Sequence, residues 1–167
     1  MSNSDTNAII IAQICSEIEP GKKMLQKLVY LIGRKGINLG LNYSIHYFGP
    51  YSSKLDTTMH TLESYDKLKI DTTGNTHIIR LGEVPIEGVL DSNTQVAVDF
   101  VMNNFSRKTA HELEAITTLD YVANNILDSS AQDEDIVNKV IQIKGNKFSP
   151  DYLMGCLDEL KQLKFIV

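Results

Sequence analysis

The chain has 167 residues, of which 43% are hydrophobic and 22% charged, and a formal net charge of -5. This length is typical of one ordinary domain or of two small halves that share a core, and the composition excludes wholesale disorder. Because no stretch approaches the roughly 20 apolar residues of a membrane span and the start lacks the pattern of a secretory signal, we expect a cytoplasmic protein with no membrane partner.

Two helices are predicted near the start of the chain, at about 6–18 and 23–35. Apolar residues recur in both at helical spacing, Pro20 and Gly21 end the first, and Gly36 closes the second as a left-handed cap. In the second helix we expect the apolar residues to face inward and the basic residues to lie outside and at its end.

A connector at 37–42 and a short extended segment at 43–48 come next, and Gly49-Pro50 is expected to turn the chain. Ser52 or Ser53 can cap a third helix at about 52–64.

The stretch 68–81 reads as a β-hairpin with Gly74 at its tip. Helices followed at once by a hairpin are typical of a winged helix-turn-helix, in which the third helix would be the recognition helix and 68–81 the wing.

The second half is predicted to be helical after a linker at about 82–90. Ser92 or Asn93 is expected to cap its first helix, and Ser149, followed by Pro150, its last. The predicted helices span about 94–104, 109–127, 134–143 and 150–163.

The fold class is therefore mainly α with a small β-hairpin. We expect a winged helix-turn-helix-like half at 1–82 packed on a helical half at 91–167, or one continuous domain. Residues 148–166 echo 51–70 in pattern, as a duplication or as two converged units of a helix followed by a strand.

The sequence contains no recognisable catalytic or metal-binding motif. The four histidines form no metal-ligand spacing, and the phosphate-binding and hydrolase motifs GxxxxGK[ST], GxGxxG and GxSxG are missing. His60 and Glu63 could form an acid–base pair on one helix face or simply a solvated surface, and Glu112 and Glu114 are expected on a helix surface. We therefore expect no catalytic residue, cofactor or metal, and two reduced buried thiols, Cys15 and Cys156.

The basic residues are concentrated in one stretch. Residues 1–90 carry nine basic and nine acidic side chains and residues 91–167 seven and twelve, but 36 consecutive residues between Glu19 and Asp56 contain no acid. Any electropositive face is expected there.

The run HYFGPYSSKL, residues 46–55, lies in this acid-free stretch. Tyr47 and Phe48 could pack in the core with Tyr51 covering the start of the third helix, or the run could present hydroxyl and basic groups at a helix amino end, where a phosphate can bind. The candidate binding face consists of Lys22, Lys23, Lys27, Arg34, Lys35, Tyr47, Tyr51, Ser52, Ser53 and Lys54.

Several segments of the chain resemble one protein family. They are Lys27-Leu28-Val29-Tyr30-Leu31-Ile32, Tyr47-Phe48-Gly49-Pro50-Tyr51-Ser52 with Leu55, and the stretches 110–122 and 148–166. The first two resemble the "KLvYL … YGPYS..L" signature of the YwgA-like winged-helix proteins, which are similar to Panacea-type antitoxin domains. The resemblance implies a mostly helical fold with a small wing and no known catalytic activity, and Panacea-type domains are associated with neutralising toxins by protein contact.

The leading functional hypothesis is a non-catalytic regulatory or interaction protein whose partner is a protein or duplex DNA. The third helix offers one Lys and no Arg for reading bases, which limits sequence-specific DNA recognition. The alternatives are an antitoxin-like or phage-defence protein acting through protein contact, and an uncharacterised enzyme. The oligomeric state stays open, with a homodimer among the alternatives.

Overall fold

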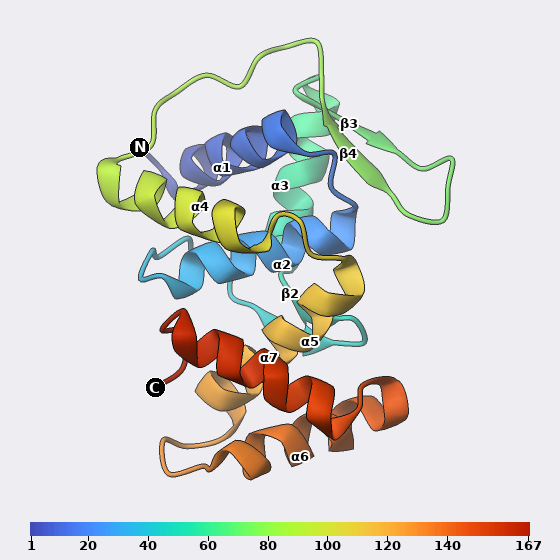
Figure 1. Cartoon of the computed structure of the whole chain (residues 1–167). Coiled ribbons are helices and arrows are strands. Elements are labelled where there is room, and N and C mark those ends of the chain that lie inside the picture. The colour runs from blue at the N-terminus through green and yellow to red at the C-terminus, as the bar shows by residue number, and fades with distance from the viewer.

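The computed structural model describes residues 1–167 as a mainly α-helical protein with seven α-helices and two small antiparallel β-hairpins (Figure 1). A helix–helix–hairpin–helix–hairpin arrangement forms the N-terminal half, and the remaining helices form the C-terminal half. The predicted fold class, a winged-helix-like half packed on a helical half, is confirmed.

Helix α1 (Asn3–Glu17) begins about three residues earlier than the sequence pattern predicts. The reason is a capping box. The Ser2 hydroxyl accepts a hydrogen bond from the Asp5 backbone N–H, and the Asp5 carboxylate accepts one from the Ser2 backbone N–H. Two helix donors that would otherwise lack partners are thereby satisfied.

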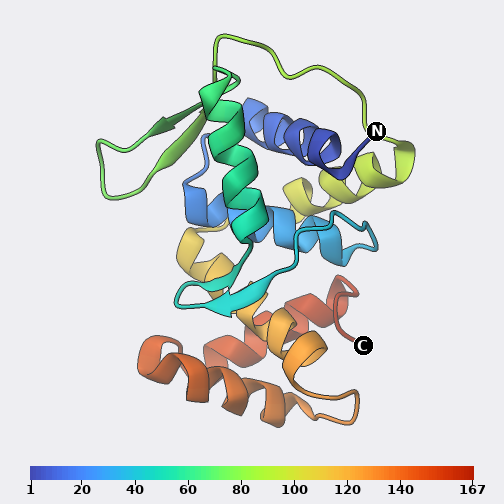
Figure 2. The ribbon, with the colours of Figure 1, turned by 180° about the vertical axis from the view of Figure 1, so that it is seen from behind.

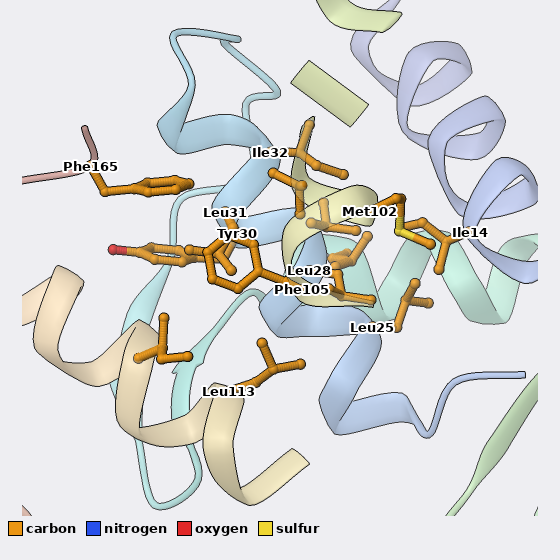
Figure 3. Packing of buried hydrophobic residues seen from close by; sticks show 14 of the residues in the cluster. Ile14, Leu25, Leu28, Tyr30, Leu31, Ile32, Met102, Phe105, Leu113 and Phe165 are labelled. Carbon is orange, nitrogen blue, oxygen red and sulfur yellow. The ribbon is translucent and has the colours of Figure 1, made fainter. Parts of the chain in front are cut away.

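Helix α2 (Lys22–Arg34) is the central element of the molecule. All eight residues from Leu25 to Ile32 are buried, because α1, α4, α5 and the strand β2 all pack against this helix. Figure 3 shows its leucine and isoleucine side chains packed among residues of α1, α4 and α5. Gly36 follows with φ of +89°, so the predicted left-handed cap is confirmed.

A short hairpin that the sequence did not predict as a pair joins α2 to α3. Strand β1 (Ser44–His46) pairs with β2 (Gly49–Tyr51), and the chain reverses at Tyr47-Phe48. The prediction that Gly49-Pro50 turns the chain is wrong, since both residues belong to β2. That strand packs on α2 and α5, which holds it extended.

Helix α3 (Ser53–Ser64) and the hairpin of β3 (Leu68–Asp71) and β4 (Ile78–Leu81) follow as predicted. The hairpin has the register Leu68↔Leu81 and Ile70↔Ile79, and it projects from the body like a wing (Figure 2).

The C-terminal half begins with α4, which lies against α2. Its cap is Asp91, whose carboxylate accepts a hydrogen bond from the Thr94 N–H at 2.8 Å, so the prediction of Ser92 or Asn93 as the cap is wrong. The bounds of the helical elements are α4 (Ser92–Phe105), α5 (Ala110–Tyr121), a π-helical turn (Val122–Ile126), α6 (Asp133–Lys144), a 3-10 turn (Gly145–Lys147) and α7 (Pro150–Gln162).

The last helix, α7, begins where the sequence predicts. Ser149 caps it, and Pro150 lies in its first turn. The segment after α7 forms no strand, so the predicted echo of helix followed by strand between 51–70 and 148–166 is wrong.

The buried hydrophobic side chains form one cluster of 38 residues drawn from both halves. Cys15 and Cys156 belong to it and are both free and buried, which confirms the expected thiols. None of the helices has the length and apolar character needed to cross a membrane.

Candidate functional site

A cleft of about 310 Å³ opens between the first turns of α2, the β1–β2 hairpin and the start of α3. We call it the basic cleft. Its lining residues are Lys22, Lys23, Gln26, Lys27, His46, Tyr47, Phe48, Gly49, Pro50, Tyr51 and Asp56. In Figure 2 the β1–β2 hairpin lies between α2 and α3 on one side and α5, α6 and α7 on the other.

Two of the lysines that line the cleft already have partners within it. Lys22 forms an ion pair with Asp56 at 2.7 Å. The Lys23 ammonium lies 3.2 Å from the centroid of the Phe48 ring, in a cation–π contact. The first turn of α2 thus contacts both α3 and the hairpin.

Lys27 does not lie on the outer face of α2, and the prediction that it does is wrong. Its side chain is buried, with the residue 2% exposed, because α2 is covered on nearly all sides. Its ammonium donates a hydrogen bond to the Lys23 carbonyl oxygen at 3.2 Å. Burial lowers the pKa of Lys27 to about 8, an effect that Glu114 opposes and the neighbouring lysines reinforce.

Glu114 on α5 lies beneath the hairpin and is 3% exposed, so its predicted place on a helix surface is wrong. Its carboxylate pairs with Lys147 at 2.8 Å and with Lys144 at 3.3 Å. The sequence predicts neither lysine as part of the site, since both lie about a hundred residues from the hairpin. No local pattern in the sequence marks them.

The tip of the hairpin carries two exposed aromatic rings. Tyr47 is 78% and Phe48 39% exposed, so the alternative in which both pack in the core is wrong. The Lys147 ammonium lies 5.4 and 5.0 Å from the two ring centroids, and Lys144 donates a hydrogen bond to the Tyr47 carbonyl oxygen. Lysines of the C-terminal half therefore hold the tip in place.

The other end of the hairpin is fixed by Gln26 and Ser52. The Gln26 side-chain amide donates to the Ser52 carbonyl oxygen and accepts from the Ser52 N–H, both at 2.9 Å. The Ser52 hydroxyl accepts a hydrogen bond from the Leu55 N–H as the cap of α3 and donates one to the Leu41 carbonyl oxygen. Ser52 is buried, so it positions the hairpin and does not face a ligand.

Arg34 and Lys35 also belong to the predicted face, but they lie at the far end of α2, away from the cleft. The Arg34 guanidinium donates to the Asp120 carboxylate at 2.7 Å and to the Phe165 carbonyl oxygen at 2.9 Å. Lys35 donates to the Leu163 carbonyl oxygen. Arg34 thus binds both α5 and the end of the chain, and Lys35 binds the end of the chain.

Asp120, which Arg34 contacts, is itself fully buried. It also accepts a hydrogen bond from the Tyr30 hydroxyl at 2.6 Å. Burial raises the pKa of Asp120, and the Arg34 guanidinium and the Tyr30 hydroxyl oppose this shift.

The structure therefore brings together only part of the predicted face. Lys22, Lys23, Lys27, Tyr47 and Tyr51 line the cleft. Ser53 and Lys54 are exposed at the first turn of α3 and lie outside the lining.

The charges around the cleft are predominantly positive. Five lysines (Lys22, Lys23, Lys27, Lys144 and Lys147) gather around two carboxylates, those of Asp56 and Glu114, in a chain whose net charge is -5. Such a concentration of one sign attracts anions.

The His60 and Glu63 side chains lie 3.5 Å apart on α3, and each is about half exposed. No group of three or more His, Cys, Asp and Glu side chains is arranged to hold a metal ion.

The chain matches no protein-family model and no curated protein. The resemblance to the YwgA-like proteins therefore stays a prediction.

Proposed function

We propose that the protein is a non-catalytic interaction protein on a winged-helix scaffold, and that its basic cleft and hairpin tip bind an acidic segment of a partner protein. The observation that carries the proposal is the convergence of five lysines and two exposed aromatic rings on one site of an otherwise acidic chain. Tyrosine and phenylalanine are enriched at protein interfaces, and complementary charge supplies specificity and a fast association rate.

The hairpin tip suits an interface because its backbone is held on both sides. Lys144 fixes the turn, and Gln26 fixes the residue that follows β2. Since little conformational entropy remains to be lost there, exposed aromatic groups at the tip can contribute to affinity at low entropic cost. The resemblance to Panacea-type domains, which act by protein contact, favours the same function.

Duplex DNA is the second candidate partner, and the helix–helix–hairpin order favours it. The charges of the α3 and wing surfaces favour it less. In α3 Lys54 stands against Asp56 and Glu63, and on the wing Arg80 is paired with Glu19 and Asp71. Little free positive charge is left for phosphates.

Photo-crosslinking at the hairpin tip tests the proposal. Tyr47 is replaced by a benzophenone amino acid in the full chain, which is then expressed in its source cells and irradiated. We expect adducts whose crosslinked peptides are rich in Asp and Glu. We also expect Lys23→Glu combined with Lys147→Glu to remove them, because the charge reversal repels the acidic segment.

Lys139→Glu serves as the matched control, because Lys139 is a half-buried lysine of α6 outside the cleft. It should leave the adducts unchanged. Adducts with nucleic acid in place of protein would support the DNA alternative. Protein adducts that persist after the double charge reversal would contradict the proposed surface.

A further inference from the structure

Lys27 differs from the other lysines in and beside the basic cleft, because it has neither a carboxylate within 4.0 Å nor an aromatic ring as a partner. Lys22, Lys144 and Lys147 each have a carboxylate within 4.0 Å, and Lys23 lies on Phe48. Lys27 has one hydrogen bond, to a backbone carbonyl. Because an ammonium has three donors, two remain for another acceptor.

A buried ammonium without a close counter-ion is costly, and the Glu114 carboxylate acts on Lys27 only from beyond 4.0 Å. Lys27 lines the cleft although it is only 2% exposed, so a ligand that enters the cleft lies against this lysine. The cleft volume of about 310 Å³ is sufficient for a carboxylate-bearing side chain.

We propose that the basic cleft is a carboxylate site in which Lys27 is the counter-ion, and that Lys27 takes up a proton when the carboxylate binds. The inference rests on the proposed function and deepens it, because it assigns the group of the acidic segment that enters the cleft. Besides the exposed Lys23, the lining contains one lysine without a close carboxylate partner, which is Lys27. Its single charge matches a carboxylate better than the double charge of a phosphate, for which proteins favour several donors or the planar guanidinium of an arginine.

The proton uptake follows from the state of Lys27 in the free protein. Burial holds its pKa at about 8, so a substantial fraction of the side chain is neutral at slightly alkaline pH. A bound carboxylate favours the charged form and raises this pKa. Binding therefore takes up protons near pH 8, and affinity falls as the pH rises through this range.

Other titratable groups face the same cleft and must be separated from Lys27. Those in its lining are Lys22 and Lys23 of α2, His46, Tyr47 and Tyr51 of the hairpin and Asp56 of α3. Glu114 of α5, Lys144 of α6 and Lys147 of the following turn lie behind the hairpin and outside the lining, and they act on Lys27 by charge. Burial also lowers the pKa of Lys144, whose Glu114 partner opposes the shift. Variants at Lys27 identify its own contribution.

Isothermal titration calorimetry of the full chain tests the inference. The probe is an acetylated, amidated tetraglutamate peptide, titrated at low salt in buffers of different ionisation enthalpy, from about pH 7.5 to about pH 9. We expect binding that weakens with pH and a proton uptake that peaks above about pH 8. Tetraglutamine should not bind.

Lys27→Met should weaken binding at least about tenfold at the lower pH and abolish the pH-dependent uptake, because it removes the charge while keeping an apolar chain of similar length. Lys27→Arg should restore binding and remove the loss above about pH 8, since an arginine stays charged. Lys139→Met is the matched control and should bind like the wild type. A circular dichroism melt verifies that each variant is folded.

Three further probes identify the source of the carboxylate and the limits of the site. Tighter binding of the same peptide with a free C-terminus assigns the site to a chain end, and equally tight binding of glutarate assigns it to a small dicarboxylate. Either result supports the carboxylate site. Inorganic phosphate binding more tightly than the peptide would overturn it, as would wild-type affinity in a folded Lys27→Met.

The two proposals can fail separately. Protein adducts at position 47 together with tetraglutamate binding that ignores Lys27 would leave the proposed function intact and remove the carboxylate site. Lys27-dependent binding of tetraglutamate or glutarate without any protein adduct would leave the site and remove the protein partner.

Discussion

Gly49 decides how closely the β1–β2 hairpin approaches α5. Its φ is +108°, a backbone conformation that favours glycine, and an added Cβ would lie 3.3 Å from the Thr118 hydroxyl oxygen and 3.7 Å from Glu114 Cγ. The side of the hairpin that faces Glu114 therefore depends on this glycine.

We expect Gly49→Ala to lower the free energy of unfolding by about 1 to 3 kcal/mol, because the alanine is strained at this φ and its methyl group crowds α5. Urea unfolding measures the change. Gly155→Ala is the matched control, since Gly155 in α7 has no atom within 4 Å of an added Cβ. It should raise stability by about 0.5 to 1 kcal/mol. Equal effects of the two substitutions would contradict the role given to Gly49.

At the scale of the element, helix α2 shows why a pattern of charges misplaces a side chain. Its lysines and arginine suggest an outer face, but neighbours on all sides bury Leu25 to Ile32, Lys27 included. The start of α3 shows a similar limit. The sequence offers two adjacent serines as caps, and only the hydrogen bonds that Ser52 makes with Gln26 and with the Leu41 carbonyl oxygen decide that Ser52 is the cap.

Ser52→Ala should lower the free energy of unfolding by roughly 2 to 3 kcal/mol, because it removes the cap of α3 and leaves the Leu41 carbonyl oxygen without its donor. Ser53→Ala is expected to change it by less than about 0.5 kcal/mol, since Ser53 is exposed and is not the cap. Chemical denaturation of the two variants side by side gives the comparison. A larger loss of unfolding free energy in Ser53→Ala than in Ser52→Ala would contradict this assignment and make Ser53 the cap.

At the scale of the whole molecule, the two halves are joined by a shared core and by the buried network around Asp120. Tyr30 and Arg34 of α2 both donate to this carboxylate of α5, and Arg34 also contacts the segment after α7. The halves are therefore expected to unfold as one cooperative unit.

Removal of the central carboxylate tests this coupling. Asp120→Ala should cost about 3 to 5 kcal/mol, because it leaves Arg34 and the Tyr30 hydroxyl without their partner. Asp120→Asn, which keeps an acceptor for Tyr30, should cost less. Hydrogen exchange should show protection falling together in α2 and α7. A loss confined to the C-terminal half would show that the halves unfold separately.

The sequence by itself determined most of the helices, the β3–β4 wing and the burial of the two cysteines, because hydrophobic periodicity, capping residues and turn residues are local signals. It also located the acid-free stretch from which much of the basic cleft is built. Only the tertiary structure decided that Lys27 is buried, that Arg34 and Lys35 bind the end of the chain, and that Glu114, Lys144 and Lys147 lie beside the hairpin. These depend on contacts between residues far apart in the chain, and no local pattern encodes which surfaces meet when the helices pack.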